Sequence, residues 1–274
     1  MLTEKLNNGV EIPVIGLGTY RIGHTDEETY RAVRSALEVG YRHIDTATLY
    51  LNEKPVGRAI RESGIAREDI FVTTKLWGSD VLSNRIHEAF DGSLSNLGLD
   101  YVDLYLVHWP VKGKLGFTWQ TMEQIYQTGK AKSIGVSNHL IHHLEELLQE
   151  ASIVPAVNQM ELHPYLTQKD VVAYCRRKGI VPEAWSPLGS SKIPLLQEEM
   201  LKDIGARYDK SPAQIVLRWN IDTGVVSIPK SSDFHRQQEN IAIFDFQLTP
   251  EEIGQIDALN RDYRTGIDPD KISF

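Results

Sequence analysis

The chain has 274 residues, of which 41% are hydrophobic and 24% charged, so it is long enough to bury a sizeable core. Its formal net charge of -8 argues against nucleic acid as a partner. Cys175 is the single cysteine, which excludes an intrachain disulfide. Because neither an apolar leader nor an apolar run of membrane-spanning length is present, we expect a cytoplasmic protein with no membrane partner.

Strand-like and helix-like segments alternate along nearly the whole chain. The first residues predict a hairpin, because Asn8-Gly9 is typical of a type I′ turn. Eight strand-like runs follow, at residues 14–18, 43–46, 70–74, 102–107, 131–136, 156–159, 180–184 and 225–228. Segments with one apolar face predict helices between them, at residues 26–38, 54–63, 83–97, 118–128, 141–150, 168–178 and 212–223.

Capping residues support these boundaries. Thr25 and Glu28 predict a capping box, and Ser211-Pro212 is typical of a helix start. Eight strands alternating with helices, with no break in composition, predict an α/β protein: one (β/α)8 TIM barrel domain over residues 1–274. Residues 195–208 predict an extra helix between the seventh and eighth strands, and the polar tail at 262–274 could fold over the barrel mouth.

Polar side chains stand where three of the predicted strands end. The second strand ends at Asp45, with Tyr50 just beyond it; the third ends at Lys75, and the fourth at His108. Each residue alone would more often be a helix cap, a packed aromatic or a solvated group. Strand ends form the active-site face of a (β/α)8 barrel. An acid, a phenol, an amine and an imidazole together therefore predict a proton-transfer set.

Seven motifs, in chain order, resemble the aldo-keto reductase family. They are GYRHIDTA (40–47), KLW (75–77), LVHWP (106–110), SIGVSN (133–138), VNQMELHP (157–164), WSPLG (185–189) and IPKS (228–231). The resemblance extends from about residue 10 to 260 and is to the prokaryotic type, similar to 2,5-diketo-D-gluconate and glyoxal reductases. It implies a (β/α)8 barrel that reduces aldehydes and ketones with a nicotinamide cofactor, usually NADPH, and without a metal.

The resemblance also assigns roles to the four strand-end residues. Tyr50 is expected to give its proton to the carbonyl oxygen of the substrate. Lys75 is expected to lower the pKa of that phenol, and Asp45 to pair with Lys75. His108 is expected to orient the substrate by a hydrogen bond.

The cofactor site is expected outside any standard nucleotide-binding motif. The stretch from Gly16 to Gly23 lacks the glycine spacing of a Rossmann fold, and His24 stands where a phosphate loop needs lysine. The resemblance instead assigns the nicotinamide carboxamide to Ser137, Asn138 and Gln159, and ring stacking to Trp185. It places other cofactor contacts at Gly18, Thr19, Tyr20, Ser186, Leu188 and Ser190, and the 2′-phosphate of NADPH at Lys230, Ser231, Ser232, Arg236, Glu239 and Asn240.

The sequence also bears on cofactor preference and on the substrate pocket. Asp233 adds a carboxylate near the expected phosphate, so weaker use of NADH stays open. The resemblance also assigns the walls of the substrate pocket to Tyr20, Leu49, Trp77, His108 and Trp109. The loop at 111–117 is shorter than in many members of that family and the tail is also short, which predicts an open pocket. The resemblance suggests small carbonyls such as glyoxals, aromatic aldehydes or keto sugars as substrates.

Other interpretations are weaker. His139, His142 and His143 lie on one face of a helix start, and a polar, partly exposed first turn is favoured over a metal site. Asp45, Glu161 and Glu183 at strand ends suggest a glycosidase, which leaves Lys75 unexplained. A cofactor-sensing barrel with little turnover is the third alternative. Because the family is often monomeric, we expect a monomer.

Overall fold

Eight parallel strands form the sheet at the centre of the structure, a computed structural model that describes residues 2–274. In order around the sheet they are β3 (Leu17–Gly18), β4 (His43–Asp45), β5 (Phe71–Leu76), β6 (Leu104–Val107), β7 (Ile134–Ser137), β8 (Val157–Glu161), β9 (Val181–Trp185) and β10 (Val226–Ile228).

The two edges of this sheet meet. Ile15, just before β3, pairs in parallel with Ser227 of β10. The amides of Gly16 and Gly18 donate to the carbonyls of Ser227 and Pro229, at 2.9 and 3.1 Å. The predicted (β/α)8 barrel is therefore confirmed, and its eight strands agree with the expected runs.

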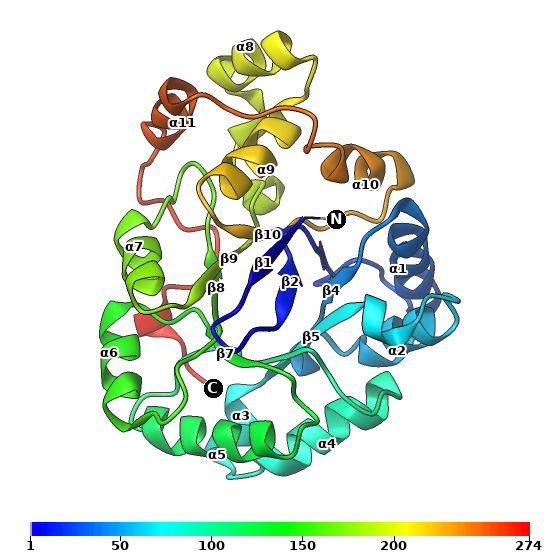
Figure 1. Ribbon diagram of the computed structural model, residues 1–274, viewed down its shortest axis with the longest axis vertical. Helices are drawn as coiled ribbons and strands as arrows, with labels where there is room; N and C mark the ends of the chain where they lie inside the picture. Colours follow the sequence, from blue (N-terminus) through cyan, green and yellow to red (C-terminus); the bar gives the residue numbers. More distant parts are fainter. Residues whose placement is uncertain (1) are drawn as a thin grey trace.

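Helices surround the barrel (Figure 1). They are α1 (Asp26–Val39), α2 (Glu53–Arg61), α3 (Gly78–Leu82), α4 (Ile86–Leu97), α5 (Leu115–Gln127), α6 (Ile141–Glu150), α7 (Lys169–Arg177), α8 (Glu199–Tyr208), α9 (Pro212–Asp222), α10 (Phe234–Ile241) and α11 (Pro250–Asp257). The predicted extra helix is confirmed as α8, preceded by a short turn at Leu195–Gln197. Within residues 2–274, no helix has the length and apolar character that a membrane crossing needs.

Capping side chains mark the starts of several helices, among them α1, α9, α10 and α11. Ser211 and Gln214 form a complete capping box at the start of α9. At α1 the box is only half formed, because Glu28 accepts from the amide of His24 at 2.7 Å rather than from Thr25. The helix predicted from residue 83 begins at Ile86, since Asn84 takes a left-handed φ of 55°.

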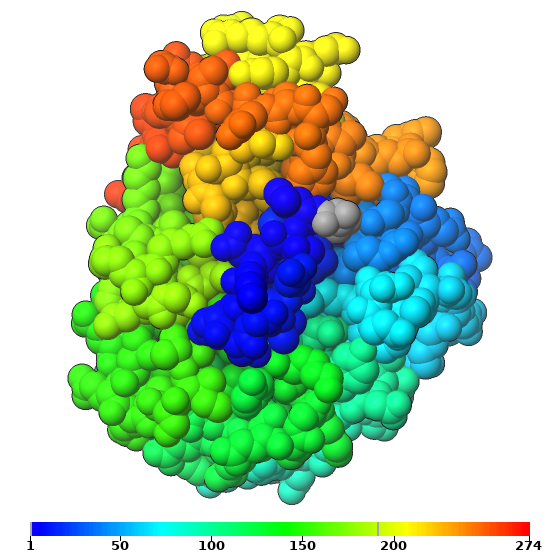
Figure 2. All heavy atoms as spheres, in the orientation of Figure 1, coloured from blue at the N-terminus to red at the C-terminus, as the bar shows by residue number. Residues whose placement is uncertain are grey.

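The N-terminal hairpin closes the end of the barrel that faces the viewer in Figures 1 and 2. Its strands are β1 (Thr3–Lys5) and β2 (Glu11–Pro13). Buried side chains of Leu6 and Ile12 pack with residues at the starts of the barrel strands, among them Phe71, Leu104 and Val226. The carboxyl ends of the strands are therefore left for the site.

The hairpin is confirmed, but its predicted turn type is wrong. A type I′ turn needs a positive φ at both central residues, and here Gly9 takes a φ of 89° whereas Asn8 does not enter the positive region. The amide of Gly9 donates to the carbonyl of Leu6 at 2.9 Å, and the amide of Leu6 to that of Val10 at 2.8 Å. The loop is thus one residue longer, with glycine alone at the left-handed position.

Candidate active site

A cavity of about 980 Å³ lies at the carboxyl ends of the strands. All of the expected cofactor and substrate residues line it except Thr19 and Ser232. Thr19 is fully buried, and its hydroxyl donates to the carbonyl of Asp45 at 2.9 Å, so it ties two strands together beneath the cavity. Ser232 is exposed outside it. The cavity has the size of a site for a small-molecule cofactor and substrate.

Lys75 is fully buried and does not itself line the cavity, but it contacts Asp45 and Tyr50, which do. Its Nζ donates to Asp45 Oδ1 at 2.6 Å, to the carbonyl of Thr46 at 2.9 Å and to the hydroxyl of Tyr50 at 3.4 Å. All three hydrogens of the ammonium group therefore have a partner. A buried charge needs such pairing, because its desolvation is otherwise costly.

Burial and charge set the protonation of this group. Burial works to lower the pKa of Lys75, but Asp45 and Tyr50 beside it produce a net rise, so the ammonium form is kept. Burial raises the pKa of the Tyr50 phenol to about 12, although Lys75 acts in the opposite direction. The expected lowering by Lys75 is present, and it is outweighed by desolvation of the phenol.

His108 follows β6 directly, and its amide continues the sheet by donating to the carbonyl of Leu76 at 3.1 Å. Its imidazole lies edge-on to the rings of Tyr50 and Trp77, with centroids 5.6 and 5.3 Å apart. Burial, aided by the charge of Lys75, holds the pKa of His108 well below its ordinary value. The ring is therefore neutral and can offer one N–H to a ligand next to Tyr50.

Amide and hydroxyl groups gather on the other side of the cavity. Asn138 Nδ2 donates to the carbonyl of His108 and to Ser137 Oγ, both at 3.0 Å, and Asn138 Oδ1 accepts from Trp185 Nε1 at 2.8 Å. The hydrogen of the Ser137 hydroxyl stays free to donate into the cavity. The bond from Asn138 fixes the indole of Trp185, which is only partly buried.

Two exposed cations stand at the cavity rim near the start of α10. Neither Lys230 nor Arg236 forms an ion pair within residues 2–274, although the chain carries a formal charge of -8. Asp233 is occupied as the N-cap of α10, where its carboxylate accepts from the amide of Arg236 at 2.9 Å. Glu239 accepts from the hydroxyl of Ser211. The rim can thus bind an anionic group.

Comparison with known proteins assigns the chain to a family. The Aldo/keto reductase family matches residues 14–261. The chain belongs to this family. It is 50% identical to glyoxal reductase of Bacillus subtilis over 99% of this chain and 98% of that one. It is 43% identical to methylglyoxal reductase DkgA of Salmonella typhimurium, over 97% and 96% of the two chains.

The crystal structure of MGS-M4, an aldo-keto reductase from a deep-sea metagenome library of the Medee basin, superposes on this chain with a TM-score of 0.96. That chain is 45% identical, and the match covers 99% of this chain and all of that one.

Members of this family are reductases, and these findings support an oxidoreductase that acts on carbonyl groups with a nicotinamide cofactor. The geometry is unsuited to the glycosidase alternative. Glu183 is fully buried, and Glu161 is occupied by four hydrogen bonds. The cavity therefore lacks the two free carboxylates that flank a scissile glycosidic bond.

The C-terminal tail crosses the cavity mouth and supplies walls that the family resemblance did not assign. Thr265, Gly266, Ile267 and Ile272 line the cavity, and the ring of Phe274 lies edge-on to Trp77 at 5.2 Å. The tail therefore folds over the mouth of the barrel, as its position in the sequence suggested. The only sequence signal for it was an irregular polar segment at the end of the chain.

Glu161 anchors the start of this tail. Its Oε1 accepts from the amide and hydroxyl of Thr265 at 2.6 and 2.5 Å, and its Oε2 accepts from the amide of Gly266 at 3.1 Å. A Cβ atom at Gly266 would lie 2.5 Å from the ring of Trp185. Glycine therefore lets the tail pass directly over the indole.

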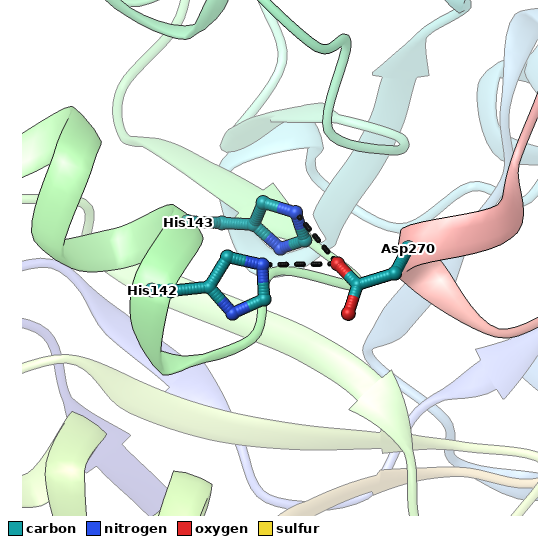
Figure 3. Close-up of side chains that lie close together, drawn as sticks. All are labelled: His142, His143 and Asp270. Atoms are coloured by element: carbon teal, nitrogen blue, oxygen red, sulfur yellow. Dashed lines mark hydrogen bonds and ion pairs between the residues drawn. The ribbon is translucent and has the colours of Figure 1, made fainter.

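A second contact fastens the far part of the tail. His142 and His143 of α6 point their Nε2 atoms at the same carboxylate oxygen of Asp270, at 2.9 and 3.3 Å (Figure 3). The amide of Leu140 donates to Nδ1 of His143 at 3.1 Å, so the neutral ring carries its hydrogen on Nε2. A metal ion would need that same atom, and the geometry is instead that of a hydrogen-bonded clasp.

The third histidine of the group lies elsewhere. The prediction of a polar, partly exposed first turn is wrong for His139, which is 1% exposed. Its Nδ1 faces the carbonyl of Ser137 at 2.9 Å, and burial lowers its pKa to about 3. His139 is thus a neutral core residue beneath the cavity.

Proposed function

We propose that this chain reduces small aldehydes and ketones to alcohols with NADPH, using Tyr50 as the proton donor. The observation that carries the proposal is the buried Lys75, which contacts both Asp45 and the hydroxyl of Tyr50, two residues that line a large cavity. When bound, the reduced nicotinamide supplies a hydride to the carbonyl carbon. The protein must supply the proton and hold the substrate.

The proton is assigned to the Tyr50 hydroxyl. As the carbonyl oxygen gains negative charge, Tyr50 O–H donates to it and becomes a phenolate, which the ammonium of Lys75 stabilises from 3.4 Å. Asp45 holds that ammonium in place from the opposite side. Neutral His108 donates a second hydrogen bond to the same oxygen and so orients the substrate. Tyr50 then regains a proton from solvent.

The groups around the cavity fit a nicotinamide cofactor. The Ser137 hydroxyl offers a donor and the side-chain carbonyl of Gln159 an acceptor, which is the pattern that a primary amide needs. The partly exposed indole of Trp185 offers a stacking face. Glyoxals and similar small dicarbonyl compounds are the proposed substrates, in line with the names of the relatives.

One assay tests the reaction class. The protein is mixed with NADPH and either methylglyoxal or an aromatic aldehyde, and the loss of NADPH absorbance is followed. Loss that depends on substrate is expected. Binding of NADPH without turnover of any carbonyl in the panel would favour the cofactor-sensing alternative.

Arg236 is expected to decide the preference for NADPH over NADH. A guanidinium binds a phosphate by charge-assisted hydrogen bonds, each worth roughly 1.5–3 kcal/mol. We expect Arg236→Ala to raise KM for NADPH by about 10- to 100-fold and to leave KM for NADH nearly unchanged. His235→Ala, at an exposed neighbouring position, is the matched control. Equal effects on the two cofactors would show that Arg236 does not bind the 2′-phosphate.

The clasp at Asp270 is expected to affect the carbonyl substrate and not the cofactor. Asp270→Ala frees the tail end that carries Phe274, so the wall at Trp77 is less well held. Because the clasp is largely exposed, we expect a rise in KM for the carbonyl of only about three-fold. KM for NADPH should stay the same, and Lys271→Ala provides the control. A selective effect on NADPH would contradict this role.

A further inference from the structure

Glu183 is a buried carboxyl to which the proposed reaction gives no role. It lies in β9, fully buried, and faces Asp45 and His43 from β4, Lys75 from β5 and Gln159 from β8. The partners of Lys75 Nζ are Asp45, Thr46 and Tyr50, so among residues 2–274 no cation is in hydrogen-bond contact with Glu183. A carboxyl in this position needs another reason to be buried.

The direct partner of Glu183 is the amide of Gln159. Gln159 Nε2 donates to Asp45 Oδ2 at 2.8 Å and to Glu183 Oε2 at 2.9 Å. An amide nitrogen carries two hydrogens, and both are therefore used. The reverse orientation of the amide is disfavoured, because it would place the Gln159 oxygen against the carboxylate of Asp45.

This bonding leaves one free atom on Gln159. Its Oε1 has no hydrogen-bond partner in the described part of the chain, and Gln159 lines the cavity. With one hydrogen held by Asp45 alone, the amide could still swing about that single bond. The second bond, to Glu183 on the neighbouring strand, fixes the plane of the amide.

We propose that Glu183 is a positioning residue, which fixes Gln159 so that its side-chain oxygen accepts a hydrogen bond from the amino group of the nicotinamide carboxamide. This inference rests on the proposed cofactor site. Together with the hydroxyl of Ser137, the fixed oxygen distinguishes the two ends of the carboxamide and so sets how the ring lies beneath the substrate.

Protonation of Glu183 is consistent with this role. Burial, together with the charge of Asp45, raises the pKa of Glu183 to about 8, so the group is neutral at neutral pH. A neutral carboxyl still accepts from Gln159 through one oxygen. The other oxygen, Oε1, lies 3.6 Å from Nε2 of His43, whose pKa is lowered to about 3 by burial and which is thus an uncharged neighbour.

The ratio of the affinities for NADPH and for a cofactor analogue tests this role, because a loss of stability alone would not change that ratio. The reduced 3-acetylpyridine analogue of NADPH keeps the carbonyl but has a methyl group in place of the carboxamide amino group. We expect the wild-type protein to bind NADPH about ten-fold more tightly than this analogue, measured by quenching of tryptophan fluorescence. In Glu183→Met, which removes the acceptor at similar length, the preference should fall to about two-fold.

Two further variants separate orientation from general damage. Glu183→Gln keeps an oxygen that can accept from Gln159, and it should retain the wild-type preference. Glu53→Met is the matched control, because Glu53 is 3% exposed and accepts from Thr74 at 2.7 Å and Asn96 at 3.2 Å, away from the cavity. It should lower stability without changing the preference.

The outcomes distinguish this inference from the proposed function. If the wild-type protein does not bind NADPH, the proposed function fails. If it binds and turns over NADPH but Glu183→Met retains the full preference, the positioning role is overturned. Should Glu183→Met not fold, Glu183→Thr takes its place, since the shorter side chain cannot reach Gln159.

Discussion

Tyr50→Phe is expected to lower kcat for carbonyl reduction by about 10²- to 10⁴-fold, the usual value of a general acid. Phenylalanine keeps the ring that packs against Tyr20 and His108, with centroids 5.0 and 5.6 Å away, and removes only the proton. The affinity for NADPH should therefore change little. Steady-state turnover and fluorescence titration measure the two effects separately.

A tyrosine hydroxyl far from the cavity provides the control. Tyr30 donates to Glu62 at 2.7 Å on the surface, and Tyr30→Phe should leave turnover unchanged. If Tyr50→Phe retained wild-type turnover, another group would have to supply the proton.

The ionisation of the Tyr50 phenol also predicts how kcat for reduction depends on pH. Because burial raises the pKa of Tyr50 to about 12, the acid form persists below that pH and is lost only above it. Reduction limited by this proton should therefore show no decline between about pH 6 and 9, where an ordinary phenol is also protonated. A fall in kcat with an apparent pKa near 7 would contradict Tyr50 as the donor.

Lys75→Met is expected to affect activity and stability together. Removal of the ammonium leaves the carboxylate of Asp45 buried without its partner at 2.6 Å. Breaking a buried ion pair in this way costs roughly 3–5 kcal/mol of unfolding free energy. Turnover should fall by at least about 10²-fold, because nothing then stabilises the phenolate of Tyr50. Urea unfolding and steady-state kinetics measure these quantities.

A double variant separates the two effects. Adding Asp45→Asn to Lys75→Met removes the unpaired charge, so most of the lost stability should return. Turnover should not return, because the ammonium is still missing. If stability and turnover both recovered, Lys75 would matter only for folding. If neither recovered, the role of Lys75 would not depend on its ion pair with Asp45.

Much of the fold follows from patterns that are local in the chain. The strand at 102–107 and the helix at 26–38 have apolar residues at the expected periods, and the structure has β6 and α1 there. The sequence patterns did not predict details that depend on the backbone angles of single residues. Asn84 takes a left-handed φ of 55° that delays α4, and Asn8 does not take the positive φ of a type I′ turn.

Site residues at strand ends could be predicted from the sequence better than site residues in loops. Asp45, Lys75 and His108 could be found because each lies at or next to the carboxyl end of a strand, and parallel strands bring such ends to one face. Thr19 and Ser232 were assigned to the cofactor site by the family resemblance, but neither lines the cavity. Which way a side chain turns in a loop depends on its neighbours in space, and the motif does not specify them.

The sequence alone determined the kinds of group at the strand ends, because strand period and capping are properties of adjacent residues. Only the tertiary structure decided how these groups are paired. Gln159 and Asp45, 114 residues apart, meet at 2.8 Å, and Glu183 takes the second amide hydrogen. Closure of the barrel buries these groups together, so each must find a partner inside it, and that need fixes which atom faces the cavity.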